Sequence, residues 1–330
     1  MANELLRVEN LKKYFKVGGK AMLHAVDGVS FTVDEGETLG LVGESGCGKS
    51  TIGNVVMQLL TADDGKILLL GENILAMKGR EKKNLYRKMQ MIFQDPYSSL
   101  NPRKDIKSIL SEPFLVQKLC RGSEMDRRIQ EVCEITGIAV SELQKFPYEL
   151  DGGKRQMVGI ARALSLNPSF IVCDEPVSAL DVSVQAKIIN LMMELQRQFG
   201  FAYLFISHDL SVVRHISNRI AVMYLGKIVE LSECDMLFAQ PRHPYTEALL
   251  SAIPKVDLDQ SMQRIVLKGD VPSPINPKAG CRFAGRCYQS REICSGQEPA
   301  FREITPGHYV ACHFPREENP ATFRQSANEV

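Results

Sequence analysis

The sequence predicts an α/β protein: a parallel sheet covered by helices, followed by a small C-terminal module. Strand patterns at 170–173 and 202–206 are separated by a helical pattern at 182–199, and this alternation is typical of parallel sheets. From about 96 to 150, charged residues with helical spacing dominate and strand signals are scarce, which predicts a helical subdomain. After about residue 237 the chain becomes rich in Pro, Gly and Cys.

Composition indicates a globular protein and gives no support for a nucleic-acid partner. The 330 residues carry a formal charge of +1, with 44% hydrophobic and 24% charged residues. The N-terminus lacks the apolar core of a secretory signal peptide, and no stretch approaches the ~18 apolar residues that would span a bilayer. Nine cysteines in such a chain indicate thiols or metal ligands rather than disulfides.

The first expected elements follow one another along the chain from residue 5 to residue 135. Residues 5–43 alternate short apolar and polar runs and finish as a buried strand that enters a glycine loop. A helical pattern from 50 to 60 and a short strand at 66–70 come next. A further helix is expected at 124–135, inside the helical subdomain.

Residues 43–51 (GESGCGKST) match the phosphate-loop pattern G-x-x-x-x-G-K-[ST] in full. The glycines let backbone N–H groups point at phosphate oxygens, Lys49 supplies a positive charge, and Ser50 offers its hydroxyl to Mg²⁺. A strand before and a helix after the loop favour this reading over an ordinary glycine turn, and predict a P-loop NTPase (RecA-like) core. The residues expected to contact ATP here are Gly43, Ser45, Gly46, Cys47, Gly48, Lys49, Ser50 and Thr51.

The strand at 170–173 ends in two acids, Asp174 and Glu175. An acidic pair after a strand is by itself more often solvated than catalytic, but the phosphate loop reverses that expectation. We interpret Asp174 as a Mg²⁺ ligand and Glu175 as the carboxylate that activates the attacking water.

These residues and their order resemble the ATP-binding-cassette ATPases over about residues 5–240. The resemblance implies that Gln94, within MIFQDP, contacts Mg²⁺ and water and links the nucleotide to membrane subunits. It implies that His208 senses the γ-phosphate and that Phe15 stacks on adenine, with Tyr14 the close alternative. It also implies a head-to-tail ATPase pair, in which ATP lies between one phosphate loop and the partner's signature sequence.

The signature departs from the family pattern L-S-G-G-Q, because this chain has LDGGK at 150–154. Gly152 and Gly153 still allow a backbone approach to phosphate, but Asp151 places a carboxylate where the serine would face the partner's γ-phosphate. We therefore expect a second, non-identical ATPase subunit and two unequal sites. The alternative is that Lys154 or a rotamer change rescues the second site.

The segment at 241–250 (PRHPYTEALL) resembles the ATPase subunits of oligopeptide and dipeptide permeases, a subgroup that also includes nickel importers. The C-terminal module at 238–330 contains four cysteines that the resemblance implies as ligands of a [4Fe–4S] cluster, namely Cys281, Cys287, Cys294 and Cys312. Zinc and free thiols remain the alternatives. The remaining cysteines are interpreted as small core or loop residues, with Cys47 a candidate for alkylation.

The sequence thus predicts an ATP-hydrolysing importer subunit for di- or oligopeptides, peripheral at the cytoplasmic face of the cell membrane. Its expected partners are a second ATPase, two transmembrane permease subunits and an extracytoplasmic solute-binding protein. An importer of nickel or another small solute is the alternative, and a soluble non-transport cassette ATPase is a more distant one. The expected domains are a catalytic core at 1–95 and 160–237, a helical signature subdomain at 96–159, and the C-terminal module at 238–330.

Overall fold

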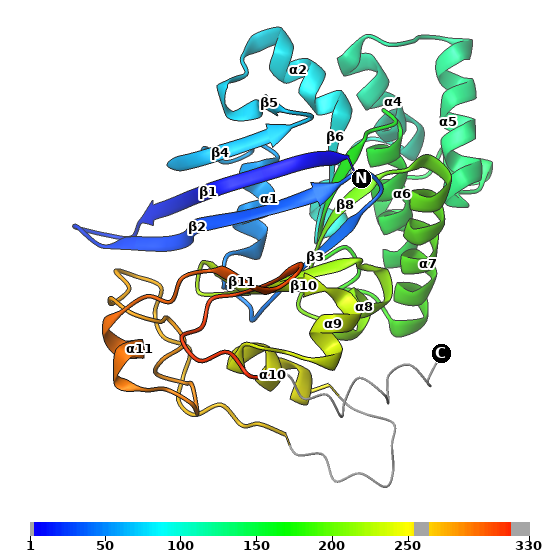
Figure 1. Ribbon diagram of the computed structural model, residues 1–330. Coiled ribbons are helices and arrows are strands. Elements are labelled where there is room, and N and C mark those ends of the chain that lie inside the picture. The colour runs from blue at the N-terminus through cyan, green and yellow to red at the C-terminus, as the bar shows by residue number, and fades with distance from the viewer. Residues whose placement is uncertain (1–2, 254–263, 318–330) are drawn as a thin grey trace, which may run out of the picture.

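The computed structural model describes residues 3–253 and 264–317, and its described part is centred on an eight-stranded sheet (Figure 1). The strand order is β11-β12-β10-β9-β3-β8-β7-β6. Strands β9, β3, β8, β7 and β6 run parallel, whereas β10, β12 and β11 continue the sheet antiparallel at one edge. The parallel strands are β3 (Thr38–Val42), β6 (Met89–Ile92), β7 (Phe170–Asp174), β8 (Ala202–Ser207) and β9 (Arg219–Tyr224).

The central strands are mainly apolar because both faces of the sheet are covered. Every residue of β3, β7 and β8 is buried. A strand covered on both faces gains nothing from alternating polar residues, which is why these segments form continuous apolar runs in the sequence. The predicted α/β fold with a parallel sheet is confirmed.

A second, antiparallel sheet in the order β2-β1-β4-β5 packs over one face of the first (Figure 1). Helix α1 (Lys49–Val56) lies in this layer, and its Ile52, Val55 and Val56 share one apolar core with residues of both sheets. The strands are β1 (Glu4–Lys16), β2 (Met22–Asp34), β4 (Asp64–Leu69) and β5 (Glu72–Asn73). Helix α2 (Gly79–Lys88) and a short 3₁₀ turn, η1 (Ile74–Ala76), lead from β5 to β6.

Helices cover the opposite face and form the helical region. Residues of α7 (Val182–Phe199) and α8 (Leu210–Ile216) share an apolar core with the main sheet. A separate small core, which includes Phe114, Ile129 and Val158, holds the helical region together. Its helices are α3 (Pro96–Ser99), α4 (Ile106–Gln117), α5 (Ser123–Thr136) and α6 (Gly152–Leu164), with the 3₁₀ turns η2 (Val140–Glu142) and η3 (Pro147–Glu149).

The C-terminal segment extends the main sheet rather than standing apart from it. Strand β12 pairs with β10, and the buried Tyr245 and Phe283 lie in the same apolar core as Tyr224 of β9. The predicted boundary at residue 238 stays a prediction, but the segment beyond it is not separate in its packing. Its elements, after β10 (Lys227–Glu233), are α9 (Cys234–Ala239), α10 (Pro244–Ser251), α11 (Glu292–Gly296), β11 (Arg302–Thr305) and β12 (His308–Val310).

A buried carboxylate fastens this segment to the sheet. Glu230 is fully buried, and its two oxygens accept hydrogen bonds from the backbone N–H groups of Arg242 (2.7 Å) and His243 (2.9 Å). The Nε2 of His308 on β12 lies 2.7 Å from the same carboxylate. Burial lowers the pKa of His243 to about 4, so its neutral Nδ1 accepts the N–H of Tyr245 at the start of α10.

Within the ranges that the structure describes, no helix combines the length and the apolar character that crossing a bilayer requires. The cysteines that the sequence assigned to core or loop positions are all buried, and they are Cys47, Cys120, Cys133, Cys173 and Cys234.

Candidate active site

The phosphate loop connects β3 to α1 and lies pressed against the neighbouring backbone. Gly43 and Gly48 have φ angles of 155° and 109°. A Cβ atom on Gly43 would lie 2.2 Å from the Met223 carbonyl oxygen, and one on Gly48 would lie 2.0 Å from the Ala25 carbonyl oxygen. Only glycine fits at these two positions, so the shape of the loop is fixed by its sequence. Gly46 also has positive φ, with open space around it.

The ammonium group of Lys49 lies inside the curl of this loop. Its Nζ donates to the carbonyl oxygens of Gly43 (2.8 Å) and Glu44 (3.1 Å). Cys47 is only 4% exposed, and burial raises the pKa of its thiol above the ordinary value. The expectation that Cys47 is sensitive to alkylation is therefore wrong for this conformation, because alkylation needs an accessible thiolate.

The Ser50 hydroxyl and the Asp174 carboxylate meet at the start of α1. The Ser50 hydroxyl donates to Asp174 Oδ1 at 2.8 Å, which joins the phosphate loop to the end of β7. Asp174 is 7% exposed, and burial raises the pKa of its carboxyl group. Hydroxyl and carboxylate oxygens are the donors that Mg²⁺ prefers, and a cation here would offset the cost of the buried charge. Ser45 is exposed in the loop, and Thr51 follows Ser50 in the first turn of the helix.

Glu175 lies at the carboxyl edge of the sheet between two polar partners. Gln94 Nε2 donates to Glu175 Oε2 at 2.9 Å, and His208 Nδ1 lies 3.2 Å from Glu175 Oε1. The three residues follow β6, β7 and β8, which are adjacent parallel strands, so their ends meet at one edge. Glu175 has φ of 45°, a strained value for a residue with a side chain, and its N–H donates to the Ile206 carbonyl.

This arrangement can activate water. The Glu175 side chain is 14% exposed and that of His208 is 56% exposed, so the carboxylate is sheltered while the imidazole faces solvent. A carboxylate oriented by an amide donor and an imidazole is a suitable general base for a water molecule at the loop's mouth.

The two aromatic residues of β1 differ in their contacts. The Tyr14 hydroxyl donates to Asp27 Oδ1 at 2.6 Å, and its ring lies 4.2 Å from that of His24. Phe15 is half-buried, and Lys13 Nζ lies 5.4 Å from its ring centre. Because Tyr14 is held by its hydroxyl group, Phe15 is the better candidate for stacking on a base, as the sequence predicted first.

The signature residues occupy the start of α6. Asp151 caps this helix, with Oδ1 accepting the N–H of Lys154 at 2.8 Å, a bond that a serine could also make. Lys154 Nζ pairs with Glu142 at 2.6 Å, so its ammonium is directed to that carboxylate. A Cβ on Gly153 would lie 2.7 Å from Val184 Cγ1 of α7. The second glycine is therefore required by packing in this chain, whatever it contacts in a partner.

The four cysteines of the C-terminal segment line one small cavity of about 20 Å³. Burial raises the pKa of the Cys312 thiol to about 11, and it raises the pKa values of Cys281 and Cys287 as well. In the part of the chain that is described, no three His, Cys, Asp or Glu side chains are grouped closely enough to hold a metal ion. The four cysteines that the sequence singled out thus lie together around one cavity.

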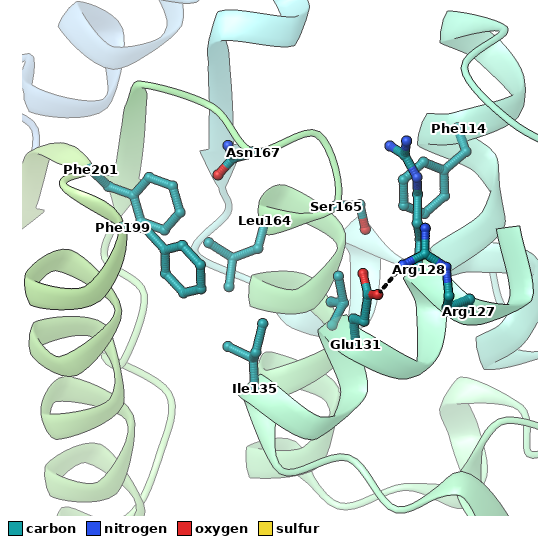
Figure 2. A pocket seen from close by; sticks show the side chains of 11 residues that line it. Phe114, Arg127, Arg128, Glu131, Ile135, Leu164, Ser165, Asn167, Phe199 and Phe201 are labelled. Atoms are coloured by element: carbon teal, nitrogen blue, oxygen red, sulfur yellow. Dashed lines mark hydrogen bonds and ion pairs between the residues drawn. The ribbon is translucent and has the colours of Figure 1, made fainter. Parts of the chain in front are cut away.

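A larger recess, of about 360 Å³, lies among α4, α5, the end of α6, the end of α7 and the link from α7 to β8. Figure 2 shows Ile135, Leu164, Phe199 and Phe201 gathered at one side of it. Arg127 pairs with Glu131 at its rim, at 2.8 Å. None of the predicted nucleotide-site residues lines this recess, so it is not part of the active site.

One set of contacts escaped the sequence reasoning. Glu44 of the phosphate loop contacts Tyr245 and Arg286, which follow it by 201 and 242 positions. A tyrosine and an arginine in a loop-rich segment give no local signal of this contact, and only the fold brings them together.

A phosphate loop, an oxygen pair for Mg²⁺ and a sheltered carboxylate at the carboxyl edge of a parallel sheet define a P-loop nucleoside-triphosphate hydrolase. Residues 26–178 match the family described as ABC transporter, and residues 229–294 match the family described as oligopeptide/dipeptide transporter, C-terminal region. The oligopeptide transport ATP-binding protein AppF of Bacillus subtilis is 50% identical over 321 residues, covering 94% of this chain and 97% of AppF.

Two further comparisons agree. YkfD of Bacillus subtilis, provisionally assigned as an oligopeptide transport ATP-binding protein, is 50% identical over 315 residues, covering 94% of this chain and 96% of YkfD. The dimeric ATP-binding cassette MJ0796, solved in a post-hydrolysis state with ADP and Pi, superimposes with a TM-score of 0.64 at 27% identity, covering 70% of this chain and 99% of that one. The chain belongs to the ABC transporter family and is one of its ATPases.

Proposed function

We propose that this chain is the ATP-hydrolysing subunit of an importer that takes up di- or oligopeptides. The observation that carries the proposal is the match of residues 229–294 to the oligopeptide/dipeptide transporter C-terminal region. Relatives at 50% identity over nearly the whole chain are named for oligopeptide transport, which supports the same substrate class. That match also weighs against a soluble non-transport ATPase.

In the proposed reaction the phosphate loop binds and orients ATP. The loop's backbone N–H groups and Lys49 contact the β- and γ-phosphates, and Ser50, Asp174 and Gln94 would hold a Mg²⁺ ion. Mg²⁺ would supply neutralisation of the charge that develops on the phosphates. Phe15 stacks on the adenine base.

Hydrolysis then depends on the group around Glu175. Its carboxylate accepts a proton from the attacking water, while Gln94 orients that water and His208 contacts the γ-phosphate. Because Gln94 belongs both to this group and to the loop that leads into the helical region, loss of the γ-phosphate would be sensed there.

We place the transmembrane permease subunits against the start of the helical region. Two apolar side chains close to Gln94 in the sequence are exposed there, namely Phe93 (36%) and Tyr97 (55%). Exposed apolar groups next to Gln94 suit a contact that transmits the state of the nucleotide. Two permease subunits and an extracytoplasmic solute-binding protein would complete the importer, with this chain peripheral at the cytoplasmic face.

Uptake by cells that lack this chain tests the substrate class. We expect loss of labelled di- or oligopeptide uptake, restored by the wild-type chain and not by Glu175→Gln. Normal peptide uptake together with loss of nickel uptake would overturn the peptide proposal in favour of a metal importer.

We further propose that the chain pairs with a non-identical ATPase, and that Asp151 weakens the site it completes. Asp151→Ser and Asp151→Asn both keep the helix cap and remove the charge next to the partner's γ-phosphate. Each should raise ATP turnover of the assembled complex about twofold, because a second site would begin to turn over. Asp126→Asn in α5 serves as the control, since it breaks an exposed ion pair with Lys107 away from the signature and should not affect turnover. Unchanged turnover in both Asp151 variants would contradict the asymmetry.

We also propose that the four C-terminal cysteines hold a [4Fe–4S] cluster with a structural role. The kind of donor supports the proposal, since four thiols line one cavity in a loop-rich segment. The thiols would have to move closer together, because no three of the described side chains are grouped closely enough to hold a metal ion. The full chain purified without oxygen should contain about four iron and four sulfide ions, lost in Cys294→Ser and kept in the buried control Cys133→Ser. Stoichiometric zinc, or no metal at all, would rule the cluster out.

A further inference from the structure

The C-terminal segment contacts the phosphate loop at its first variable residue. Arg286 pairs with Glu44 through two contacts, Nη1 to Oε2 at 2.8 Å and Nη2 to Oε1 at 3.2 Å. The backbone N–H of Glu44 donates to the Tyr245 hydroxyl at 3.0 Å. The side chains of Arg286 and Glu44 are only 10% and 27% exposed. Because this ion pair has two contacts and is largely shielded from solvent, it holds both side chains in one geometry.

The same segment also supports the middle of the loop. The carbonyl oxygen of Cys47 accepts the N–H of Gly226, in the turn between β9 and β10, at 2.8 Å. The guanidinium group of Arg282 in turn donates to the carbonyl of Leu225 in that turn and pairs with Asp27 of β2. Arg286 thus contacts the phosphate loop directly, whereas Arg282 supports it only through the turn at 225–226.

An aromatic cluster keeps these contacts rigid. The rings of Tyr245, Phe283 and Tyr224 lie with centroids 4.7 to 5.4 Å apart, and all three are at most 1% exposed. Arg286 also contacts this cluster, since its Nη1 donates to the Tyr224 hydroxyl at 3.4 Å. The Tyr245 hydroxyl and the Arg286 guanidinium are therefore held by one packed unit.

We propose that Arg286 and Tyr245 are positioning residues for nucleotide binding, which set the conformation of the phosphate loop through Glu44. This inference rests on the proposed binding of ATP by residues 43–51. The phosphates bind to N–H groups of the loop, and fixing the Glu44 peptide before ATP arrives lowers the conformational entropy lost on binding. The C-terminal segment would therefore set the affinity of the chain for ATP, beside any contact it makes with other subunits.

The test compares ion pairs at the two ends of β3. Glu44, which pairs with Arg286, comes just after β3 in the phosphate loop. Glu37, which pairs with Arg219 at 3.2 Å, comes just before β3 at its far end; the side chains of Arg219 and Glu37 are 24% and 8% exposed. The Kd of the full chain for MgATP should rise about tenfold in Arg286→Gln and in Glu44→Gln, with kcat little changed and KM raised. Arg219→Gln should lower the thermal unfolding midpoint but leave the Kd within about twofold.

A second pair of variants isolates the tyrosine hydroxyl. Tyr245→Phe keeps the ring and should raise the Kd about fivefold, whereas Tyr203→Phe removes a buried hydroxyl bonded to the Met192 carbonyl and should leave it unchanged. The double variant Glu44→Arg with Arg286→Glu exchanges the two charges and should recover part of the affinity for MgATP that the single variants lose.

Two outcomes overturn the inference. One is an unchanged Kd in Glu44→Gln, a variant that does not depend on folding of the C-terminal segment. The other is an equal rise in Kd for the Arg219 and Tyr203 controls, which would reduce the contacts to general stability. A wild-type chain that fails to bind MgATP would instead overturn the proposed nucleotide site itself, so the two failures are distinguishable.

Discussion

Glu175→Gln should lower ATP turnover by about 10²- to 10⁴-fold and leave the affinity for MgATP close to that of wild type. Glutamine is nearly isosteric and can keep a bond with Gln94 or His208, but its amide cannot accept a proton from water. The carboxylate contacts no phosphate-loop residue in the described structure; its polar partners are Gln94 Nε2 at 2.9 Å and His208 Nδ1 at 3.2 Å. The loss should therefore appear in kcat and not in KM.

Single-turnover hydrolysis and equilibrium binding of MgATP separate the two effects. Glu233→Gln, at the exposed end of β10, is the matched control and should hydrolyse ATP normally. A tenfold or smaller loss in Glu175→Gln would show that another group activates the water. If Glu175→Gln weakened the binding of MgATP by as large a factor as it lowered turnover, Glu175 would instead be a residue that holds the nucleotide.

Lys49→Ala should weaken the binding of MgATP about 100-fold, the second large effect. Its ammonium lies within the loop, 2.8 Å from the Gly43 carbonyl and 3.1 Å from that of Glu44, and would move to the phosphates when they enter. Alanine removes the charge and leaves these two carbonyls facing the bound anion.

The control for Lys49 is Lys12→Ala, which breaks an exposed ion pair between Lys12 and Asp64, both in the antiparallel sheet. Equilibrium binding of MgATP to the full chain should be normal in this control. If Lys49→Ala binds MgATP as wild type does and only turns it over slowly, the assignment of Lys49 to ground-state binding is wrong.

The elements that depend on local pattern could be predicted from the sequence. The helix expected at 182–199 is α7 with the same bounds, and the strand expected at 170–173 is β7 with one more residue. The phosphate loop and the acids after β7 could be found because their chemistry needs particular residues at fixed spacing. The helix expected at 50–60 ends at Val56, because the residues that follow form a turn.

What the sequence could not provide depends on contacts between distant segments. The choice between Tyr14 and Phe15 required the position of Asp27, and the pairing of Lys154 required that of Glu142. The short strands β11 and β12 carry little apolar pattern; β12 is defined by its pairing with β10, and β11 by its pairing with β12. In each case the deciding contact is a side-chain or strand pairing that periodicity does not encode.

The most direct test of a peptide importer is ATP hydrolysis by the assembled membrane complex, with and without peptide-loaded binding protein. Peptide should stimulate hydrolysis, and the stimulation should disappear when this chain carries Glu175→Gln. Hydrolysis that ignores peptide, or stimulation that survives Glu175→Gln, would contradict the account, the first in its substrate and the second in the site that performs the work.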